Sequence, residues 1–329
     1  MVGVQKSVIS FLSVVGVLLA PSQLLAQVAG RVPASKRVVP VWDDITEDTT
    51  FRHTNTYLID GEVHVQPGVT LTIQDGTTIL IKNGKVRGRW IDRSALIFES
   101  GSRMNAETVY FRAGGADNRP EKRSDNGGIW FLGSYKEAEK DGVRVSLTPG
   151  MKASRFAALE VVASDLGSGD PVPLPRNLNP RGDDLDGVSV LGVGHKEWKI
   201  RAIRSEYSGD DGFDVTNSDI ELDSLVVKRP FEDALNISSS RVRIVKHLEV
   251  SMVRSEVTDR DLFDLEVDDG PSRVILAKGC EVDLSGIFGD ELKLRSNDLP
   301  QPDPCNCKPY LFKGTSHRNS TSVYSISED

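Results

Sequence analysis

The sequence predicts an all-β fold, a parallel β-solenoid with about three short strands per coil. Two observations support this prediction. Short segments alternate apolar and polar residues with the period of two that strands require, and Gly, Asn and Asp separate these segments. A motif of the form Asp-x-apolar-x-apolar also occurs five times, with its aspartates 25, 22, 28 and 29 residues apart. Because helical periodicity is hard to find outside residues 137–140, a doubly wound α/β fold is not expected.

The first 26 residues have the form of a secretory signal peptide. Lys6 supplies a positive charge, residues 8–20 form a short apolar run, and Ala26 ends a segment suitable for cleavage. We therefore expect a secreted, periplasmic or cell-surface protein, with an uncleaved anchor as the alternative. No later apolar run reaches the roughly 18 residues of a membrane helix, so no membrane span is expected after cleavage.

The rest of the chain divides by composition. A polar lead-in is expected to cap the first coil, the solenoid follows, a Gly- and Pro-rich surface loop interrupts it, and a tail with alternating prolines either caps the last coil or is loose. The predicted ranges are 27–54 for the lead-in, 55–298 for the solenoid, 166–186 for the loop and 299–329 for the tail.

The repeat is clearest in the second half of the chain. A second strand follows three of the motifs, and a third strand begins a few residues later. Such a unit cannot bury its apolar face alone, whereas stacked coils create a continuous interior. An antiparallel sandwich would not need one motif to recur every 22–29 residues. The five motifs are Asp186–Val190, Asp211–Val215, Asp233–Ile237, Asp261–Leu265 and Asp290–Leu294.

Several segments resemble secreted bacterial right-handed parallel β-helix proteins, a group that includes the pectate-lyase-like folds. The opening coils between Tyr57 and Phe111 carry Gly-Glu-Val-His-Val, Pro-Gly-Val-Thr-Leu-Thr-Ile and Leu-Ile-Phe-Glu-Ser-Gly-Ser. Asp125–Trp130, Ser208–Val215 and Glu232–Ile237 resemble later segments of the same group. The resemblance implies a right-handed coil, and it specifies architecture better than activity because many functions occur on this scaffold.

Stacking of the coils predicts two polar columns. Equivalent residues lie about 4.8 Å apart between strands, so the leading aspartates Asp211, Asp233, Asp261 and Asp290 should form one column at a corner, and Asp214, Asn236 and Asp264 an outward one. The predicted ligand-binding residues are Asp211, Asp214, Asp233, Asn236 and Asp264. The predicted metal ligands are Asp211, Asp233 and Asp261, with Ca²⁺ as the ion.

The same aspartates have a purely structural interpretation. Aspartate side chains commonly accept hydrogen bonds from turn backbone. Basic residues also come shortly before the motifs and could neutralise the column by ion pairing. These residues are Arg204, Lys228, Arg229, Arg254 and Arg260.

Two enzymatic hypotheses use these residues. A polysaccharide lyase needs a cation to neutralise a uronate and a basic side chain to remove a proton. The candidate catalytic residues are Lys228, Arg229, Lys246 and Arg254. A glycoside hydrolase needs two carboxyls, for which Asp210, Asp211, Asp214 and Asp233 are available. However, Gly194-His195 precedes the aspartate pair, unlike the order in the polygalacturonase-type hydrolases that these fragments resemble.

The three cysteines lie late in the chain. In an oxidising compartment, Cys280 could form a disulfide with Cys305 or Cys307, leaving one thiol. The spacing of Cys305 and Cys307 does not fit a zinc site.

The absence of a complete catalytic set favours a binding protein over a catalyst. The formal charge of −8 argues against a nucleic-acid partner. No complete catalytic set is present, so we expect a non-enzymatic module that binds an extracellular polysaccharide or cell-surface component, with Trp90, Trp130 and Trp198 able to stack on sugars if exposed. The alternatives are the lyase or hydrolase on acidic glycans, and a scaffold that presents loop 166–186 to a protein.

Overall fold

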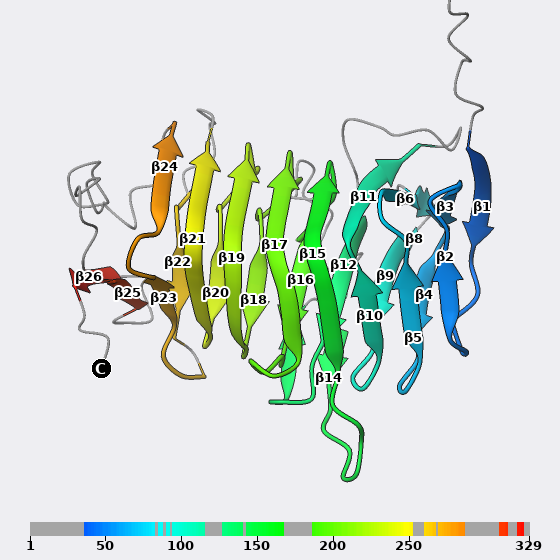
Figure 1. The fold of residues 1–329 in the computed structure, drawn as a ribbon, viewed down its shortest axis with the longest axis horizontal. Helices are drawn as coiled ribbons and strands as arrows, with labels where there is room; N and C mark the ends of the chain where they lie inside the picture. Colours follow the sequence, from blue (N-terminus) through cyan, green and yellow to red (C-terminus); the bar gives the residue numbers. More distant parts are fainter. Residues whose placement is uncertain are drawn as a thin grey trace, which may run out of the picture. The chain divides into compact units, whose positions relative to one another are not determined.

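The alternation of apolar and polar residues forms strands throughout the part of the chain that the structure describes, and no helix occurs among those residues. The computed structural model describes residues 36–82, 85–87, 90–92, 94–115, 127–140, 143–167, 186–252, 260–267, 269–286, 309–314 and 321–325. Most strands belong to two large sheets that lie face to face (Figure 1). The predicted all-β class is confirmed.

The larger sheet, the long sheet, has fifteen strands among the described residues and is parallel from its first strand to β23. Along its main path it contains β1 (Arg37–Val41), β3 (Asn55–Ile59), β6 (Thr77–Lys82), β11 (Thr108–Gly114), β15 (Arg155–Ser164), β17 (Trp198–Glu206), β19 (Asp219–Lys228), β21 (Arg241–Ser251), β23 (Arg273–Leu276), β25 (Tyr310–Gly314) and β26 (Thr321–Ser325). Beside this path lie β2 (Thr49–Phe51), β5 (Thr70–Ile73), β10 (Arg103–Ala106) and β24 (Glu281–Ser285).

The smaller sheet, the short sheet, has seven parallel strands in the described part of the chain. Its order is β22 (Asp264–Glu266), β20 (Asn236–Ser238), β18 (Asp214–Thr216), β16 (Val188–Leu191), β12 (Gly127–Leu132), β9 (Ser94–Phe98) and β4 (Glu62–Val65). Two antiparallel hairpins are separate from both sheets: β7 (Lys85–Arg87) with β8 (Trp90–Asp92), and β13 (Ala138–Lys140) with β14 (Val143–Val145).

Successive passes of the chain stack on one another in both sheets. From β16 to β22 the chain alternates between a short-sheet strand and a long-sheet strand, and each strand pairs in parallel with its counterpart in the next pass. This arrangement is consistent with a β-solenoid. Three strands per pass occur near both ends, as in β4, β5 and β6, whereas the second and third fuse into β17, β19 and β21 in between. A register shift between Leu222 and Ser224 marks the fusion point.

The chain turns between the sheets through residues with left-handed backbone. Tyr207 (φ 58°) and Arg229 (φ 55°) follow long-sheet strands, and Asn217 (φ 49°) and Ser239 (φ 50°) follow short-sheet strands. This conformation is unfavourable for most side chains. Here the backbone N–H of each such residue donates to the next pass, for example from Asn217 to the carbonyl of Ser238 at 2.8 Å. The repeated hydrogen bond stabilises each corner.

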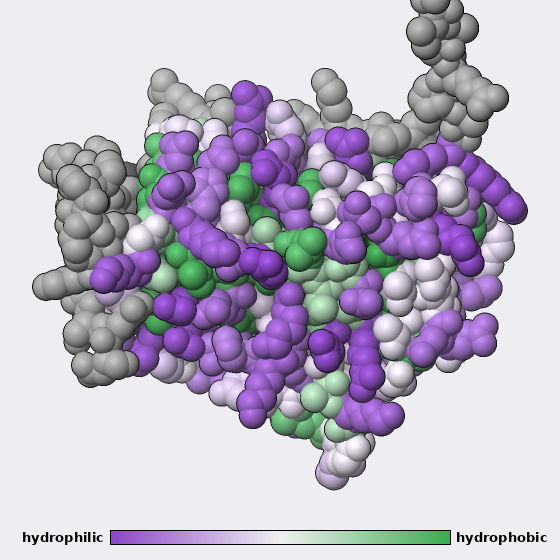
Figure 2. Space-filling view, viewed as in Figure 1, coloured by the Kyte–Doolittle hydropathy of each residue, from purple (hydrophilic) through white to green (hydrophobic). Residues whose placement is uncertain are grey.

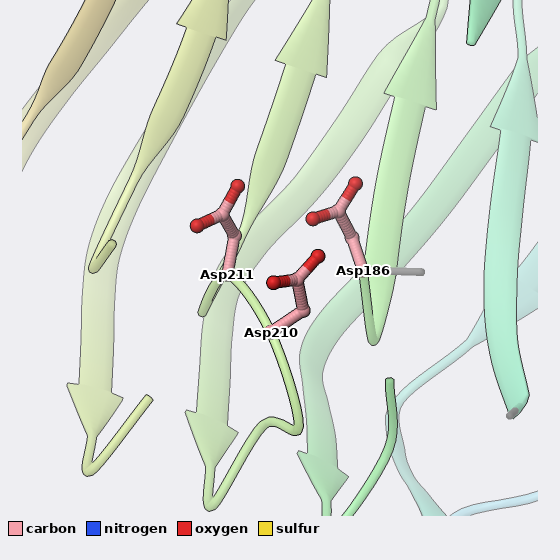
Figure 3. Close-up of side chains that lie close together, drawn as sticks. All are labelled: Asp186, Asp210 and Asp211. Carbon is pink, nitrogen blue, oxygen red and sulfur yellow. The ribbon is translucent and has the colours of Figure 1, made fainter. Parts of the chain in front are cut away.

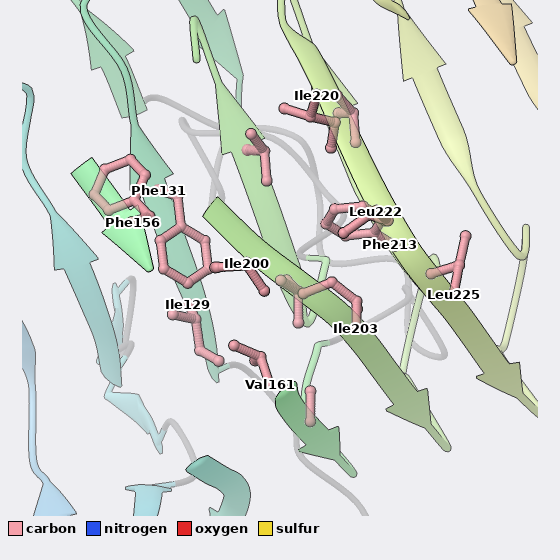
Figure 4. Close-up of a cluster of buried hydrophobic side chains, with 14 of the residues drawn as sticks. Ile129, Phe131, Phe156, Val161, Ile200, Ile203, Phe213, Ile220, Leu222 and Leu225 are labelled. Atoms are coloured by element: carbon pink, nitrogen blue, oxygen red, sulfur yellow. The ribbon is translucent and has the colours of Figure 1, made fainter. Parts of the chain in front are cut away.

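The inward side chains of both sheets form one apolar core (Figure 4). A row of aromatic rings runs through its middle: the centroids of Phe98 and Phe131 are 5.2 Å apart, those of Phe131 and Phe156 5.2 Å, and those of Phe131 and Trp198 5.6 Å. Phe213 continues the row, 6.4 Å from Trp198. Offset and edge-on contacts of this kind add stability beyond the area that they bury.

A second, smaller apolar cluster lies on the outer face of the short sheet. Trp130, Leu132 and Leu191 point outward from β12 and β16, and Ala138 and Val145 of the β13–β14 hairpin cover them. Trp130 is therefore buried, and so is Trp198 in the main core. Neither is available to stack on a sugar.

The parallel order ends at the C-terminal strands. β25 pairs with β23 in antiparallel fashion, and β26 pairs antiparallel with β25. Phe312 of β25 packs against Phe263 in the core, with ring centroids 5.0 Å apart.

In the described ranges no helix is present that could cross a membrane.

Replacing the central ring of the aromatic row should lower the free energy of unfolding strongly. Phe131→Ala removes a fully buried side chain with three aromatic neighbours, so we expect a loss of about 3–5 kcal/mol. Leu159→Ala is the control because Leu159 is 50% exposed, and it should cost less than about 0.5 kcal/mol. Urea unfolding followed by tryptophan fluorescence measures both, and equal losses would contradict the core described here.

Candidate functional site

The strand register brings the leading aspartates of the repeat into one column. Ser189 pairs with Asp214, Asp214 with Asn236, and Asn236 with Asp264. The residues three positions earlier in each pass are therefore equivalent. They are Asp186, Asp211, Asp233 and Asp261, and all four are buried. The predicted column exists over these passes, while Asp290 lies outside the described residues.

Backbone hydrogen bonds hold part of this acidic column. The backbone N–H of Asp233 donates to Asp211 Oδ1 at 2.9 Å, and that of Asp261 donates to Asp233 Oδ1. Each carboxylate thus bonds to the next pass. This is the structural role expected of aspartates at turns.

Three carboxylates converge at the N-terminal end of the column. Asp186, Asp210 and Asp211 each place a carboxylate oxygen within 4.8 Å of the others, and all three side chains are buried (Figure 3). Removal from water raises the pKa of Asp211 well above its ordinary value, and the charges of Asp233, Asp186 and Asp210 raise it further. Burial is likewise the main cause of the raised pKa of Asp233. We call Asp186, Asp210 and Asp211 the acidic cluster, and they form the candidate site.

Lys140 is the counter-charge on the outer side of the cluster. Its Nζ lies 3.0 Å from Asp186 Oδ2 and 2.8 Å from Asp214 Oδ2, and both carboxylate side chains are fully buried. Lys140 is the last residue of β13, so the hairpin that covers the short sheet also delivers this charge. Sequence reasoning missed Lys140 because it lies in an insertion outside the repeat.

Arg260 supplies a positive charge farther along the column. It directly precedes Asp261, where the two preceding passes have Asp210 and Glu232. The buried guanidinium donates to the carbonyl of Pro230, and burial lowers the pKa of Arg260 while Asp233 and Glu232 oppose that shift. Of the basic residues expected to neutralise the column, Arg260 is placed beside it.

The second predicted column is also present but is not fully outward. Asp214, Asn236 and Asp264 lie side by side on the outer face of the short sheet. Asp214 was expected to face solvent, yet it is completely buried because Lys140 and the hairpin lie over it. Asn236 and Asp264 are partly exposed. Ligand binding by these residues stays a prediction.

The candidate catalytic bases pair with acids of the long sheet. Lys228 Nζ is 2.9 Å from Glu249 Oε1, and Lys246 Nζ is 3.1 Å from Asp223 Oδ2. The Arg229 guanidinium lies over the ring of Tyr207, 5.6 Å from its centroid. Arg204, expected near the aspartates, instead contacts Glu160 at 3.3 Å.

Several other predictions fall outside the described residues. Arg254, Cys305 and Cys307, the signal segment 1–26 and most of loop 166–186 lie there. Cys280 is described and buried, and its Sγ donates to the carbonyl of Glu281 at 3.6 Å. The disulfide therefore stays a prediction.

Comparison with known proteins finds no matching family model, no matching curated protein and no matching solved structure. Function must therefore be argued from the residues themselves.

Removing the charge of Lys140 should destabilise the fold. Lys140→Gln leaves Asp186 and Asp214 without this counter-charge, and we expect a loss of about 2 kcal/mol in the free energy of unfolding, measured by urea titration. Arg144→Gln is the matched control on the same hairpin. Its ion pair with Glu139 is exposed, so the loss should be below about 0.5 kcal/mol. A Lys140 variant as stable as the control would show that the buried ion pairs contribute little.

Proposed function

We propose that the chain is a right-handed parallel β-helix of the pectate-lyase-like type, exported by its N-terminal signal segment. We further propose that it binds an extracellular polysaccharide or another repetitive surface component without catalysis. The stacked parallel sheets support the architecture. The sequence resemblance supports a right-handed coil. Export is supported by residues 1–26, in which a positive charge is followed by an apolar run and then by a small residue at the expected cleavage position.

The observation that carries the binding proposal is the regular charged surface of the long sheet. Arg201 of β17 and Lys246 of β21 both form ion pairs with Asp223 of β19, which lies between them. The distance from Lys246 Nζ to Asp223 Oδ2 is 3.1 Å. The Arg201 and Lys246 side chains are nevertheless 57% and 61% exposed. Arg241 pairs with Asp219 at 3.1 Å in a neighbouring row. Hydrophilic side chains spread across this face, with smaller hydrophobic patches among them (Figure 2).

Such a surface suits a polymer with a repeating polar unit. Strand spacing of about 4.8 Å repeats the donors and acceptors along the stack, and a linear ligand can contact several rows at once. Each contact is weak in water, but contacts joined along one chain act together. Affinity would then grow with ligand length.

The same contacts argue against the lyase alternative. A proton-abstracting base needs to be unencumbered near the group that neutralises the uronate. Lys228 and Lys246 are held by Glu249 and Asp223 on the long sheet, while Asp211 and Asp233 are buried at the corner before the short sheet. Lys228 and Lys246 are therefore each engaged by a carboxylate, and neither is an unencumbered base.

Removing the exposed cations should weaken polymer binding. We expect the full chain to bind one or more polymers on a glycan array, and Arg201→Ala/Lys246→Ala to weaken that binding about tenfold, as loss of two interface contacts does. Arg144→Ala on the hairpin is the matched control and should leave binding unchanged. Unchanged binding by the double variant would refute this surface, and ultraviolet absorbance from unsaturated products would favour the lyase.

The ion pairs should also be visible in the titration of Asp223. Burial alone would raise the pKa of Asp223, but hydrogen bonds from Arg201 and Lys246 outweigh it and lower the pKa below its usual value of 3.8. The stabilisation is therefore complete above pH 3.8 and is lost as the pH falls through the folded-state pKa. A carboxyl NMR titration should show the lowered pKa and its return toward 3.8 in Arg201→Ala/Lys246→Ala. An unshifted pKa of Asp223 in the natural sequence would contradict these ion pairs.

A further inference from the structure

The acidic cluster brings several buried carboxylates together at one corner of the coil. Asp186, Asp210, Asp211 and the adjoining Asp214 are all buried, and Lys140 pairs with Asp186 and Asp214. Farther along, Arg260 approaches Asp233 and Glu232 instead. Like charges in a buried site repel strongly unless protons or cations intervene.

One oxygen of the cluster lacks a hydrogen-bond donor in the part of the chain that the structure describes. Asp186 is 1% exposed, its Oδ2 faces Lys140 and Ser189, and its Oδ1 is buried with no hydrogen-bond partner among the described residues. Asp211 is 4% exposed, and its Oδ1 accepts a hydrogen bond from Asp233 N–H. Buried polar atoms are nearly always satisfied in folded proteins. Asp186 Oδ1, which has no donor within the described ranges, therefore indicates an additional ligand.

Another buried carboxylate shows how this fold satisfies an acid without a ligand. Glu197 is 5% exposed, and its two oxygens accept hydrogen bonds from the backbone N–H groups of Ser134, Ser154 and Gly194 at 2.8–3.2 Å. The hydroxyl of Ser134 also donates to it. The contrast with Asp186 means that burial of an acid does not by itself leave its oxygens without donors in this protein.

We propose that Asp186, Asp210 and Asp211 bind a single divalent cation of the Ca²⁺ type, and that Lys140 is a fixed charge beside it that limits the affinity. Hard cations prefer carboxylate oxygens, and Ca²⁺ binds them at about 2.3–2.6 Å, so opposite ligands lie about 4.6–5.2 Å apart. The ligand atoms of the cluster lie within 4.8 Å of one another, close enough for one cation to contact all three residues. Mg²⁺ needs about 4.0–4.2 Å and a rigid octahedron, so it should bind more weakly.

This site differs from the ligand set expected from the repeat alone. Asp211 is shared, but Asp233 and Asp261 lie in later passes, where Asp233 Oδ1 accepts from Asp261 N–H and Arg260 is nearby. Asp186 and Asp210 replace them. The cation site does not depend on polymer binding and is tested without a polymer.

The first experiment measures thermal unfolding of the full chain after chelation and with added CaCl₂ or MgCl₂. We expect Ca²⁺ to raise Tm by about 5 °C at a concentration about 100 times its Kd, and Mg²⁺ to raise it less. Asp186→Asn and Asp211→Asn, which keep the side-chain shape, should abolish the shift. Asp233→Asn is the matched control one pass away and should retain it.

Calorimetric titration with CaCl₂ tests the role of Lys140. Lys140→Gln removes the competing positive charge, and we expect it to tighten Ca²⁺ binding about tenfold, so that Ca²⁺ rescues the stability that this variant loses. An absent Ca²⁺ response in the natural sequence would overturn the site. A response that persists in both Asp186→Asn and Asp211→Asn, or that disappears equally in Asp233→Asn, would also overturn it. Lys140→Gln binding no more tightly than the natural chain would remove Lys140 from the proposal.

Discussion

Parallel hydrogen bonding between successive passes of the chain is the constraint on which the rest of this structure depends. It fixes which residue lies beside which, because a strand that slips by one position exchanges its inner and outer faces. The registers of β16, β18, β20 and β22 place Val190, Val215, Ile237 and Leu265 in one inward row. The same registers place the polar residues in rows of their own.

The rows have opposite energetic consequences on the two sides of the sheets. Stacked apolar and aromatic side chains reinforce one another, as in the contacts of Phe131. Stacked carboxylates repel, and the protein offsets that repulsion in three ways. Backbone N–H groups bond to Asp211 and Asp233, Lys140 reaches in from the hairpin, and Arg260 replaces an acid in the last described pass.

The sequence allows the repeated features to be predicted, because the repeat itself encodes the stacking. The all-β class, the parallel sheets and the alignment of Asp211, Asp233 and Asp261 all follow from the motif spacing. Three strands per coil hold only near the ends, since β17, β19 and β21 each continue without a break through the place where two strands were expected, which the motif spacing does not reveal.

What could not be predicted comes from residues outside the repeat. Lys140 and Asp214 lie 74 positions apart, in an insertion and a coil respectively, and no periodicity connects them. The burial of Trp130 and Asp214 has the same origin, because the hairpin that covers them lies outside the repeated motif. Asp186 begins a motif, but its carboxylate lies near that of Asp210 only because of how the turn between β17 and β18 folds, which the motif does not encode.

The antiparallel strands β25 and β26 bear on whether separate molecules can join end to end. A parallel stack presents at its last strand the same unpaired backbone pattern that each internal strand offers to its neighbour, which is a template for another copy. β25 occupies that pattern on β23 with the opposite chain direction. At the other end of the long sheet, β1 contains Pro40, which has no N–H to donate. Simple continuation of the parallel stack is thereby obstructed along β23, and β1 offers one backbone donor fewer to a second copy of the chain.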